Sequence, residues 1–455
     1  MSKSMADFLE AVCSHVRCKE VHESIKAELS DHIRSAKEAY VSDGLSEAEA
    51  EKKAVADMGG ADDVGKRLNW AYRRQTEWSL IAIAALMTAI SGLMIYRVGT
   101  MNEYVNFSRF LFSVLIGVGM SVGLFFLDYR YLKKISLPCY IVSLLLSLGN
   151  ILLGYPVNER NTFVRIGSWM VLMDFVLPLL VVAMAGMLMR EEGKGTFGMI
   201  RFSLLALLPA YLFLELHSLR LSILVFATTV VLLVMALWHN HFGSNRKLQI
   251  GLLTGGIGAV AAGTILSLGS KPYRMARMGV WLSRGKSDPY AGGWQMMQAD
   301  RLLSSARMFS SSSSDGILPD AATNYAWVST VANLGWWAGG LFLLLALLFA
   351  VRLFLTARKI HSRYGTYLIS ASATVLSVWL IMGIGMNLGV LPIYSGIPFL
   401  SYGGTGFVTA LALLGIALSV WRQNRVIGKE PSKEPSRPWI SRNLDGDWVI
   451  HWNRN

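Results

Sequence analysis

The chain has 455 residues, of which 53% are hydrophobic and 16% charged, and its mean hydropathy is +0.42. These values exclude a soluble protein built on a single core and indicate a polytopic membrane protein. The formal net charge of +13 does not indicate a nucleic-acid-binding protein, because the sequence has no basic, aromatic-rich module and membrane proteins collect Lys and Arg in cytoplasmic loops.

Residues 1–76 are richer in charged residues than the rest of the chain and predict a small soluble helical bundle. Apolar residues recur there at helical spacing, at Phe8, Leu9, Val12, Val16, Ile25, Leu29 and Ile33. Ser46 and Glu49 form a capping-box pattern that predicts a helix start, and Gly59-Gly60 predicts its end.

The same prefix contains Cys13 and Cys18, which with Cys139 make only three cysteines, too few for a disulfide framework. We interpret them as reduced cytosolic thiols, since one pair beside His15 is a weak pattern for a metal site. The start F-L-E-x-V-C resembles the cytosolic prefix of some Gram-positive permease-like membrane proteins. That resemblance implies an interaction or regulatory module.

The following region, residues 78–423, contains about ten apolar windows of membrane-spanning length. They cover residues 78–97, 108–127, 135–154, 168–189, 198–216, 219–239, 248–268, 326–350, 366–388 and 404–421. An even number of spans puts both termini on one side, and the distribution of Lys and Arg puts that side in the cytosol. The long loop 270–325 is then extracellular, and the basic tail 424–455 is cytosolic.

Charged residues inside or beside the spans are candidate functional residues. Asp174 lies within the fourth predicted span and needs a charged partner or a wet cavity. Arg160 and Arg165 in the loop before it have two interpretations, attraction of a phosphate-bearing substrate and contact with lipid headgroups. Asp128, at the end of the second span, is either functional or a charge at the interface beside cationic neighbours.

The polar stretch from Asp288 to Gly339 interrupts the apolar region, so chemistry at the membrane surface is expected there. Two motifs inside this stretch and two outside it resemble the SEDS family (shape, elongation, division and sporulation), which includes FtsW, RodA and SpoVE. The motifs are MNLGVLPIYSGIPFLSYGGTGF at Met386 to Phe407, LDYR at Leu127 to Arg130, DPYAGGWQMMQ at Asp288 to Gln298, and ILPDAATNYAWVSTVANLG at Ile317 to Gly335. The resemblance covers residues 78–423.

The resemblance implies polymerisation of peptidoglycan glycan strands from lipid II, usually with a class B penicillin-binding protein as partner. It also implies that residues of the matched motifs contact the substrate, at Gln295, Gln298, Ser401, Tyr402, Gly403 and Gly404. Such a reaction needs a carboxylate base near the outer face and positive charge for the leaving diphosphate. Lys271, Arg274 and Arg277 could supply that charge, and a divalent cation such as Mg²⁺ is an alternative. We expect no other cofactor and no metal site in the protein itself.

The base is where the sequence departs from the family. The family's catalytic aspartate falls on Asn324, and an amide is too weak a base to accept the proton. Asp320, four residues earlier, is the best remaining carboxylate if the segment is helical, ahead of Asp300 and Asp315. The alternative is that Asp320 only caps a helix.

The sequence therefore predicts an all-α polytopic protein of the bacterial cell membrane, preceded by a soluble helical bundle and acting in peptidoglycan assembly. Three functions stay open: a glycosyltransferase with Asp320 as base, an inactive relative that scaffolds or regulates a cell-wall complex, and a transporter of lipid-linked precursors.

Overall fold

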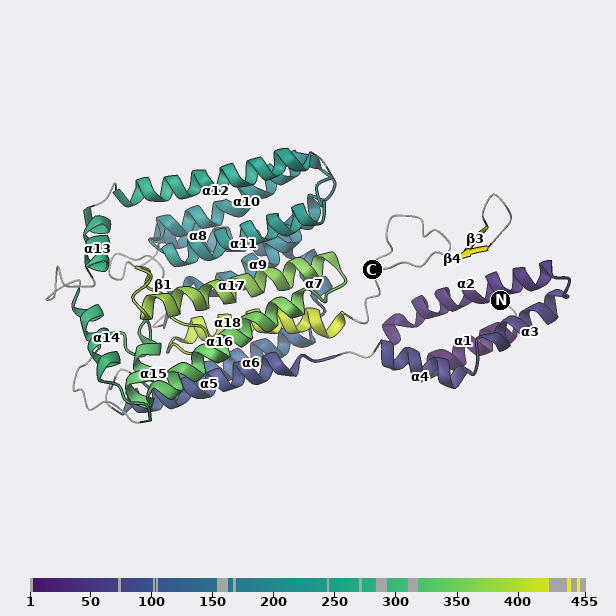
Figure 1. Ribbon diagram of the computed structural model, residues 1–455, viewed down its shortest axis with the longest axis horizontal. Coiled ribbons are helices and arrows are strands. Elements are labelled where there is room, and N and C mark those ends of the chain that lie inside the picture. Colours follow the sequence, from purple (N-terminus) through teal and green to yellow (C-terminus); the bar gives the residue numbers. More distant parts are fainter. Residues whose placement is uncertain are drawn as a thin grey trace. The chain divides into compact units, whose positions relative to one another are not determined.

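The computed structural model describes residues 3–72, 75–100, 103, 105–153, 163–166, 169–243, 245–269, 272–283, 293–309, 318–424, 440–442 and 448–450. The chain divides into two compact units, one made of Met1–Gln75 with Gln423–Asn455 and the other of Thr76–Arg422. Both units consist mainly of helices (Figure 1).

The first unit contains the predicted helical bundle. Its helices are α1 (Lys3–His15), the 3₁₀ turn η1 (Lys19–Val21), α2 (His22–Ser42), α3 (Glu47–Asp57) and α4 (Ala61–Ala71). The buried core includes all but one of the residues that the helical spacing indicated, among them Leu9, Val12 and Ile33; the exception, Leu29, packs against the core partly buried. The same unit contains a short antiparallel hairpin of β3 (Ile440–Arg442) and β4 (Trp448–Ile450).

The predicted ends of α3 are confirmed. Ser46 is its N-cap residue, and its hydroxyl accepts a hydrogen bond from the Glu49 main-chain N–H at 3.4 Å while donating to the Glu49 carboxylate at 2.7 Å. This contact to Ser46 lowers the pKa of Glu49. Gly59 follows the helix with φ +84°, a left-handed conformation that glycine adopts without strain.

The second unit is a bundle of long apolar helices. They are α5 (Trp78–Gly99), α6 (Phe107–Phe126), α7 (Tyr129–Lys134), α8 (Ser136–Leu153), α9 (Val176–Arg190), α10 (Gly195–Glu215), α11 (Leu219–Trp238), α12 (Arg246–Gly269), α13 (Pro272–Leu282), α14 (Trp294–Ser305), α15 (Ala326–Leu334), α16 (Trp336–Ala357), α17 (Arg363–Asn387) and α18 (Gly404–Gln423). Before α9, the strands β1 (Phe163–Ile166) and β2 (Trp169–Leu172) pair antiparallel and lead into the 3₁₀ turn η2 (Met173–Phe175).

Eight helices in the described part of the chain are long and apolar enough to cross a membrane, and α8 is a shorter apolar helix. The all-α polytopic membrane fold is thus confirmed. Two predicted spans have different boundaries: the window 168–189 begins with β2 and becomes α-helical only at Val176, and the window 326–350 consists of α15 and α16.

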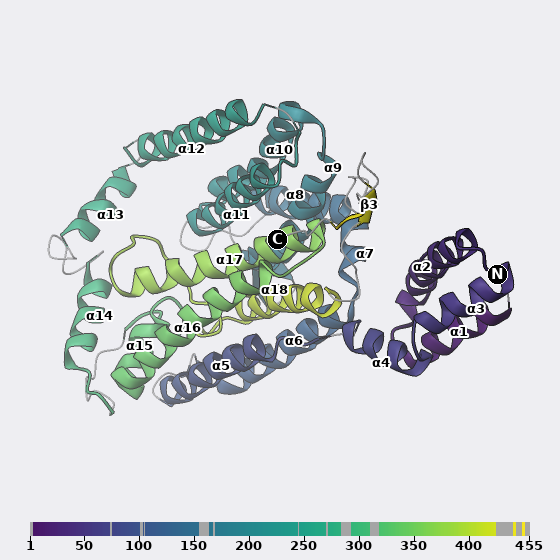
Figure 2. The ribbon, with the colours of Figure 1, turned by 45° about the vertical axis from the view of Figure 1, so that its right-hand side comes forward.

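Helix α17 lies in the middle of this unit (Figures 1 and 2) and packs against α9, α11, α15 and α16. Small and hydroxyl-bearing residues such as Ser370, Ala371, Ser372 and Ala373 are buried along it. Because small side chains let helix backbones approach closely, this composition suits a helix surrounded by other helices in a membrane.

The break between α15 and α16 lies at Gly335, which has φ +98° and ψ 169°. The main-chain N–H groups of Trp336 and Trp337 donate to the carbonyl oxygens of Arg307 and Met308, at 3.1 and 3.2 Å. A Cβ atom at Gly335 would lie 2.4 Å from the Met308 oxygen. Both the backbone angles and the available space therefore require glycine here.

Replacing Gly335 with alanine is expected to lower the free energy of unfolding by about 2–3 kcal/mol, because strained angles combine with a main-chain clash. Thermal unfolding in detergent measures the effect. Gly340→Ala in the same helix is the control, since a Cβ there meets no atom within 4 Å. Equal melting temperatures for the two variants would contradict this explanation of the break.

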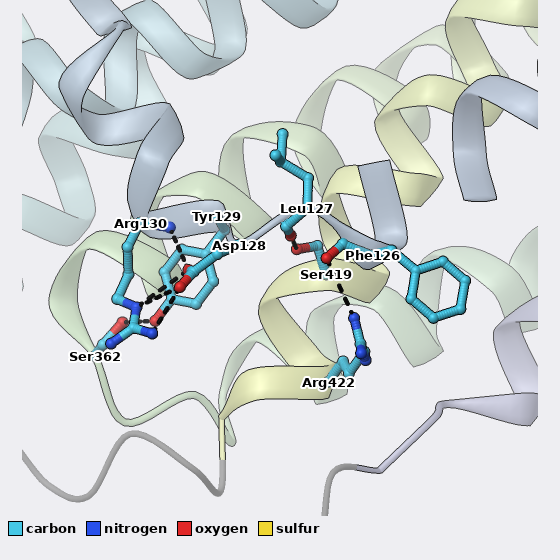
Figure 3. A network of polar contacts seen from close by, with 8 residues as sticks. All are labelled: Phe126, Leu127, Asp128, Tyr129, Arg130, Ser362, Ser419 and Arg422. Carbon is cyan, nitrogen blue, oxygen red and sulfur yellow. Dashed lines mark hydrogen bonds and ion pairs between the residues drawn. The ribbon is translucent and has the colours of Figure 1, made fainter. Parts of the chain in front are cut away.

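The corner between α6 and α8 contains the LDYR motif and shows which contacts Asp128 makes (Figure 3). Asp128 is the N-cap of α7, accepts a hydrogen bond from the Arg130 main-chain N–H at 2.9 Å, and forms an ion pair with the Arg130 guanidinium at 2.6 Å. The buried Tyr129 hydroxyl shares a hydrogen bond of 2.7 Å with Ser362. The motif thus has a structural role at this corner.

Replacing Ser362 with alanine is expected to lower the free energy of unfolding by about 1–3 kcal/mol. Ser362 is buried, caps α17 by accepting from the Gly365 N–H at 3.0 Å, and pairs with Tyr129 (Figure 3). Chemical unfolding in detergent measures the loss. Thr254→Ala is the control, because that exposed hydroxyl bonds only within its own helix; a loss of the same size there would refute the prediction.

Candidate functional site

The segment that contains Asp320 is a chain of tight turns, so the helix on which the four-residue spacing of Asp320 and Asn324 depended is not present there. Asp320 has φ +58°, a left-handed conformation that is rare for residues other than glycine. Its carbonyl oxygen accepts from the N–H groups of Thr323 and Tyr325, at 3.0 and 3.1 Å. Strained backbone of this kind concentrates at functional sites, where the surrounding structure maintains it.

The turn nevertheless brings Asp320 and Asn324 together. The Asn324 side-chain amide Nδ2 donates to Asp320 Oδ2 at 3.1 Å. Asp320 is exposed and Asn324 is half-buried. The N-cap residue of α15 is Tyr325, which makes no side-chain cap bond, so Asp320 does not cap that helix. Asn324 instead holds the exposed Asp320 carboxylate through this hydrogen bond.

The signature segment from Met386 to Phe407 holds this turn in place. Ser401 Oγ donates to the Thr323 carbonyl at 2.6 Å and accepts from the Ile397 N–H at 2.6 Å. The Tyr402 N–H donates to the Ala322 carbonyl at 2.6 Å. Ser401 and Tyr402, predicted to bind substrate, therefore fix the backbone on which Asp320 and Asn324 stand.

The two glycines of the signature lie at the start of α18. Gly404 is the first residue of the helix, and a Cβ atom there would meet Ser113 Oγ at 3.0 Å. A Cβ atom at Gly403 would meet nothing within 4 Å. Both follow directly on Tyr402 and lie beside the turn; the predicted contact with substrate stays a prediction.

Asn387, at the end of α17, is a residue of the site that sequence reasoning missed. Its Oδ1 accepts from the Val328 N–H at 3.2 Å, and its Nδ2 donates to the carbonyls of Asn324 and Gly383, both at 2.8 Å. Asn387 is buried. The sequence could have indicated Asn387, because it is an amide at the end of a long apolar helix within the Met386–Phe407 motif. Burying such an amide without a hydrogen-bond partner would cost free energy of folding.

Helix α14 brings one of the two predicted glutamines into contact with the signature segment. The Tyr394 hydroxyl donates to Gln295 Oε1 at 3.0 Å. Gln298 is half-buried on the same helix. Together with α13 and α15, this helix lies at one end of the bundle (Figure 1), so the residues around the Asp320 turn gather at that end.

Asp174 lies in η2, ahead of α9, rather than in the middle of a span. It forms a buried ion pair with Arg220 of α11, which supplies the partner that a carboxylate at this depth needs. The Arg220 guanidinium also lies over the Trp379 ring, 5.1 Å from its centre. Sequence reasoning missed Arg220 as the partner, because the two residues are 46 positions apart.

The Lys and Arg residues predicted to bind the diphosphate lie largely outside the residues that the structure describes. Arg160 and Lys271 are not among the described residues, and for Arg165, Arg274 and Arg277 only the backbone is described, in β1 and α13. Their contact with a diphosphate therefore stays a prediction. Among the described residues, no group of three or more His, Cys, Asp or Glu side chains could hold a metal ion.

Three neighbouring positions of the turn and of α15 carry no carboxylate. Ala322 and Ala332 are buried, and Asn333 donates to the Ser329 carbonyl at 2.9 Å. Asp320 is consequently the exposed carboxylate of this turn. A carboxylate in such a position can accept a proton from a bound hydroxyl.

Comparisons with known proteins agree with this fold. Residues 75–426 match the family of cell cycle proteins FtsW, RodA and SpoVE. The chain is 24% identical over 381 residues to the probable peptidoglycan glycosyltransferase FtsW of Aliivibrio salmonicida, covering 80% of this chain and 92% of that protein. It is 23% identical over 374 residues to stage V sporulation protein E of Bacillus subtilis, covering 76% and 97%.

Two solved structures have the same fold. One is a chain in a structure described as the structural coordination of polymerization and crosslinking by a peptidoglycan synthase complex; the TM-score is 0.64 at 23% identity, covering 77% of this chain and 98% of that chain. The other is a mutant of the rod shape determining protein RodA from Thermus thermophilus, with a TM-score of 0.54 at 20% identity and the same coverage of both chains.

Proposed function

This chain belongs to the cell cycle protein family of FtsW, RodA and SpoVE, and on that premise we propose that it polymerises glycan strands of peptidoglycan from lipid II. Relatives that align over most of their length are named probable peptidoglycan glycosyltransferases. The proposal is supported by a membrane domain that presents a fixed carboxylate at the position where the family carries its catalytic motif.

The observation that carries the proposal is the hydrogen bond between Asn324 Nδ2 and Asp320 Oδ2. The acceptor hydroxyl attacks the anomeric carbon of the donor sugar, and Asp320 takes the hydroxyl proton. The bond between that carbon and the diphosphate oxygen breaks, and its electron pair leaves with the lipid diphosphate. Asn324 holds the carboxylate in position for this transfer, although its own amide cannot accept the proton.

The leaving diphosphate carries negative charge that must be balanced. Cations of the loop around α13, namely Lys271, Arg274 and Arg277, are the proposed counter-charges, with Arg160 and Arg165 as a second group. A divalent cation such as Mg²⁺ is the alternative. Gln295 and Gln298 are proposed to position the sugars of the substrate through hydrogen bonds. Asp174, buried in its ion pair with Arg220, is proposed to act on the substrate only through that pair.

A class B penicillin-binding protein is the proposed partner, since a structural neighbour belongs to a complex that joins polymerisation to crosslinking. We place the protein in the bacterial cell membrane with both termini in the cytosol. The prefix of residues 1–76 and the tail of residues 424–455 would then be available to cytosolic partners, while the Asp320 turn faces lipid II outside.

Complementation in cells tests the proposal. A strain that lacks this chain is supplied with the natural sequence, with Asp320→Asn, or with a chain lacking residues 3–71, and incorporation of a fluorescent cell-wall precursor is measured. We expect Asp320→Asn to fail although it is produced at the natural level. Full rescue by Asp320→Asn combined with failure of the truncated chain would instead establish a scaffold.

A further inference from the structure

A cavity of about 70 Å³ lies between α13, α14 and the segment that follows α17. It is partly open to the exterior, and its walls combine aromatic, apolar and acidic side chains. Its walls include Trp281, Met296, Asp300, Tyr325, Ile393 and Tyr394. The cavity adjoins the candidate site, because Tyr325 directly follows Asn324.

The walls of this cavity are held by hydrogen bonds. Trp281 Nε1 donates to the Gly389 carbonyl at 2.9 Å, which ties α13 to the segment after α17. The bond from Tyr394 to Gln295 ties α14 to the same segment. Asn387, which also lines the cavity, is bonded to the Asn324 carbonyl. The cavity is therefore formed before any ligand arrives, which favours binding.

Asp300 differs from the other polar groups of the wall. Among the described residues its carboxylate makes no hydrogen bond and no ion pair, whereas Trp281, Tyr394 and Asn387 are all bonded to the protein. Asp300 is exposed, so its carboxylate can exchange water for an N–H or O–H donor of a ligand that enters the cavity.

The size of the cavity limits what can enter. About 10–15 Å³ of such volume accommodates one water molecule, so 70 Å³ holds a group of about five to seven non-hydrogen atoms. A whole sugar ring is too large, but one substituent of a ring fits. The group must combine a donor for Asp300 with an apolar end for Met296 and Ile393. An acetamido group, with one N–H and one methyl, meets both requirements.

We propose that this cavity binds the acetamido group of a 2-acetamido sugar in the glycan substrate. The Asp300 carboxylate accepts the amide N–H, and the methyl group packs against Met296 and Ile393. A sugar anchored in this way lies beside the turn that presents Asp320. The inference rests on the proposed function, because glycan strands of peptidoglycan consist of acetamido sugars.

Binding of two soluble oligosaccharides to the full-length protein in detergent tests the inference. The tetramer of N-acetylglucosamine carries the group, and the glucose tetramer cellotetraose lacks it. We expect saturation-transfer NMR to show contact with the acetyl methyl protons of the first sugar and no binding of the second. Equal signals from both sugars, or none from either, overturn the inference.

Two substitutions localise the binding. Asp300→Ala removes the acceptor, and Ala299→Leu fills the cavity from a buried position in its wall. Each is expected to weaken binding at least tenfold while the melting temperature stays within a few degrees of the natural protein. Ser304→Ala, on the exposed face of the same helix, is the control and is expected to bind normally. Unchanged binding by Asp300→Ala overturns the inference even if Ala299→Leu fails to fold.

The outcome can be separated from that of the proposed function. If the chain binds the acetamido sugar through Asp300 but makes no glycan strands, the proposed polymerase activity is refuted and the proposed binding role of the cavity is supported. If the Asp300→Ala variant makes strands with an unchanged KM for lipid II, the proposed binding role of the cavity is refuted and the proposed polymerase activity is supported. If both proposals hold, Asp300→Ala raises KM more than it lowers kcat.

Discussion

Replacing Asp320 with asparagine is expected to lower kcat for glycan-strand formation by about 10²- to 10⁴-fold, the range that a general base contributes. The two side chains have nearly the same shape, so the turn fixed by Ser401 and Tyr402 is retained and KM for lipid II stays close to the natural value. The initial rate of strand formation in vesicles, measured over a range of lipid II concentrations, separates kcat from KM.

The matched control is the exchange of the two side chains, Asp320→Asn with Asn324→Asp. Because Nδ2 of Asn324 and Oδ2 of Asp320 are 3.1 Å apart, the exchanged pair places a carboxylate one hydrogen bond away from the original. We expect it to recover a substantial part of the lost rate. Full activity of the single variant Asp320→Asn would place the base elsewhere.

Replacing Arg220 with methionine is expected to lower the free energy of unfolding by about 3–5 kcal/mol, because the Asp174 carboxylate would remain buried without a partner. The effect is large because the pair lies in the interior of the membrane domain, where water cannot replace the lost guanidinium. Unfolding in a denaturing detergent titration measures it.

Two further variants show whether the loss of stability in Arg220→Met comes from breaking the ion pair. The double variant Asp174→Asn with Arg220→Met removes both charges and is expected to regain most of the lost stability. Arg363→Gln breaks an ion pair with Glu192 that is exposed on both sides, and is expected to change stability by less than about 1 kcal/mol. If Arg220→Met and Arg363→Gln lowered the free energy of unfolding equally, burial of the Asp174–Arg220 pair would not explain its effect.

Local patterns in the sequence predicted much of the fold. The apolar spacing of Leu9, Val12 and Ile33 and the Ser46 cap were enough for the prefix, because both depend on residues a few positions apart. The apolar windows located most of the membrane helices for the same reason. They did not locate the break at Gly335, since glycine is common within membrane helices and only the Met308 carbonyl beside it shows the constraint.

The candidate site was less predictable, because its contacts join distant segments. The family resemblance identified Asn324 and the four-residue spacing added Asp320, which lies beside it through a turn instead of a helix. The pairing of Asp174 with Arg220 and the bonds made by Asn387 depend on how α11 and α17 pack, which no local pattern encodes. Such pairs are recognised only once the helices are in place.

Strand formation from lipid II by the purified natural protein tests the central claim most directly. Vesicles contain this chain, lipid II and a class B penicillin-binding protein whose crosslinking activity is blocked, and the peptidoglycan synthase complex whose structure shares this fold serves as a positive control. We predict strands that disappear when Asp320 is replaced by asparagine. No strands from the natural chain, in a preparation where the control produces them, would contradict the account and leave a scaffold in its place.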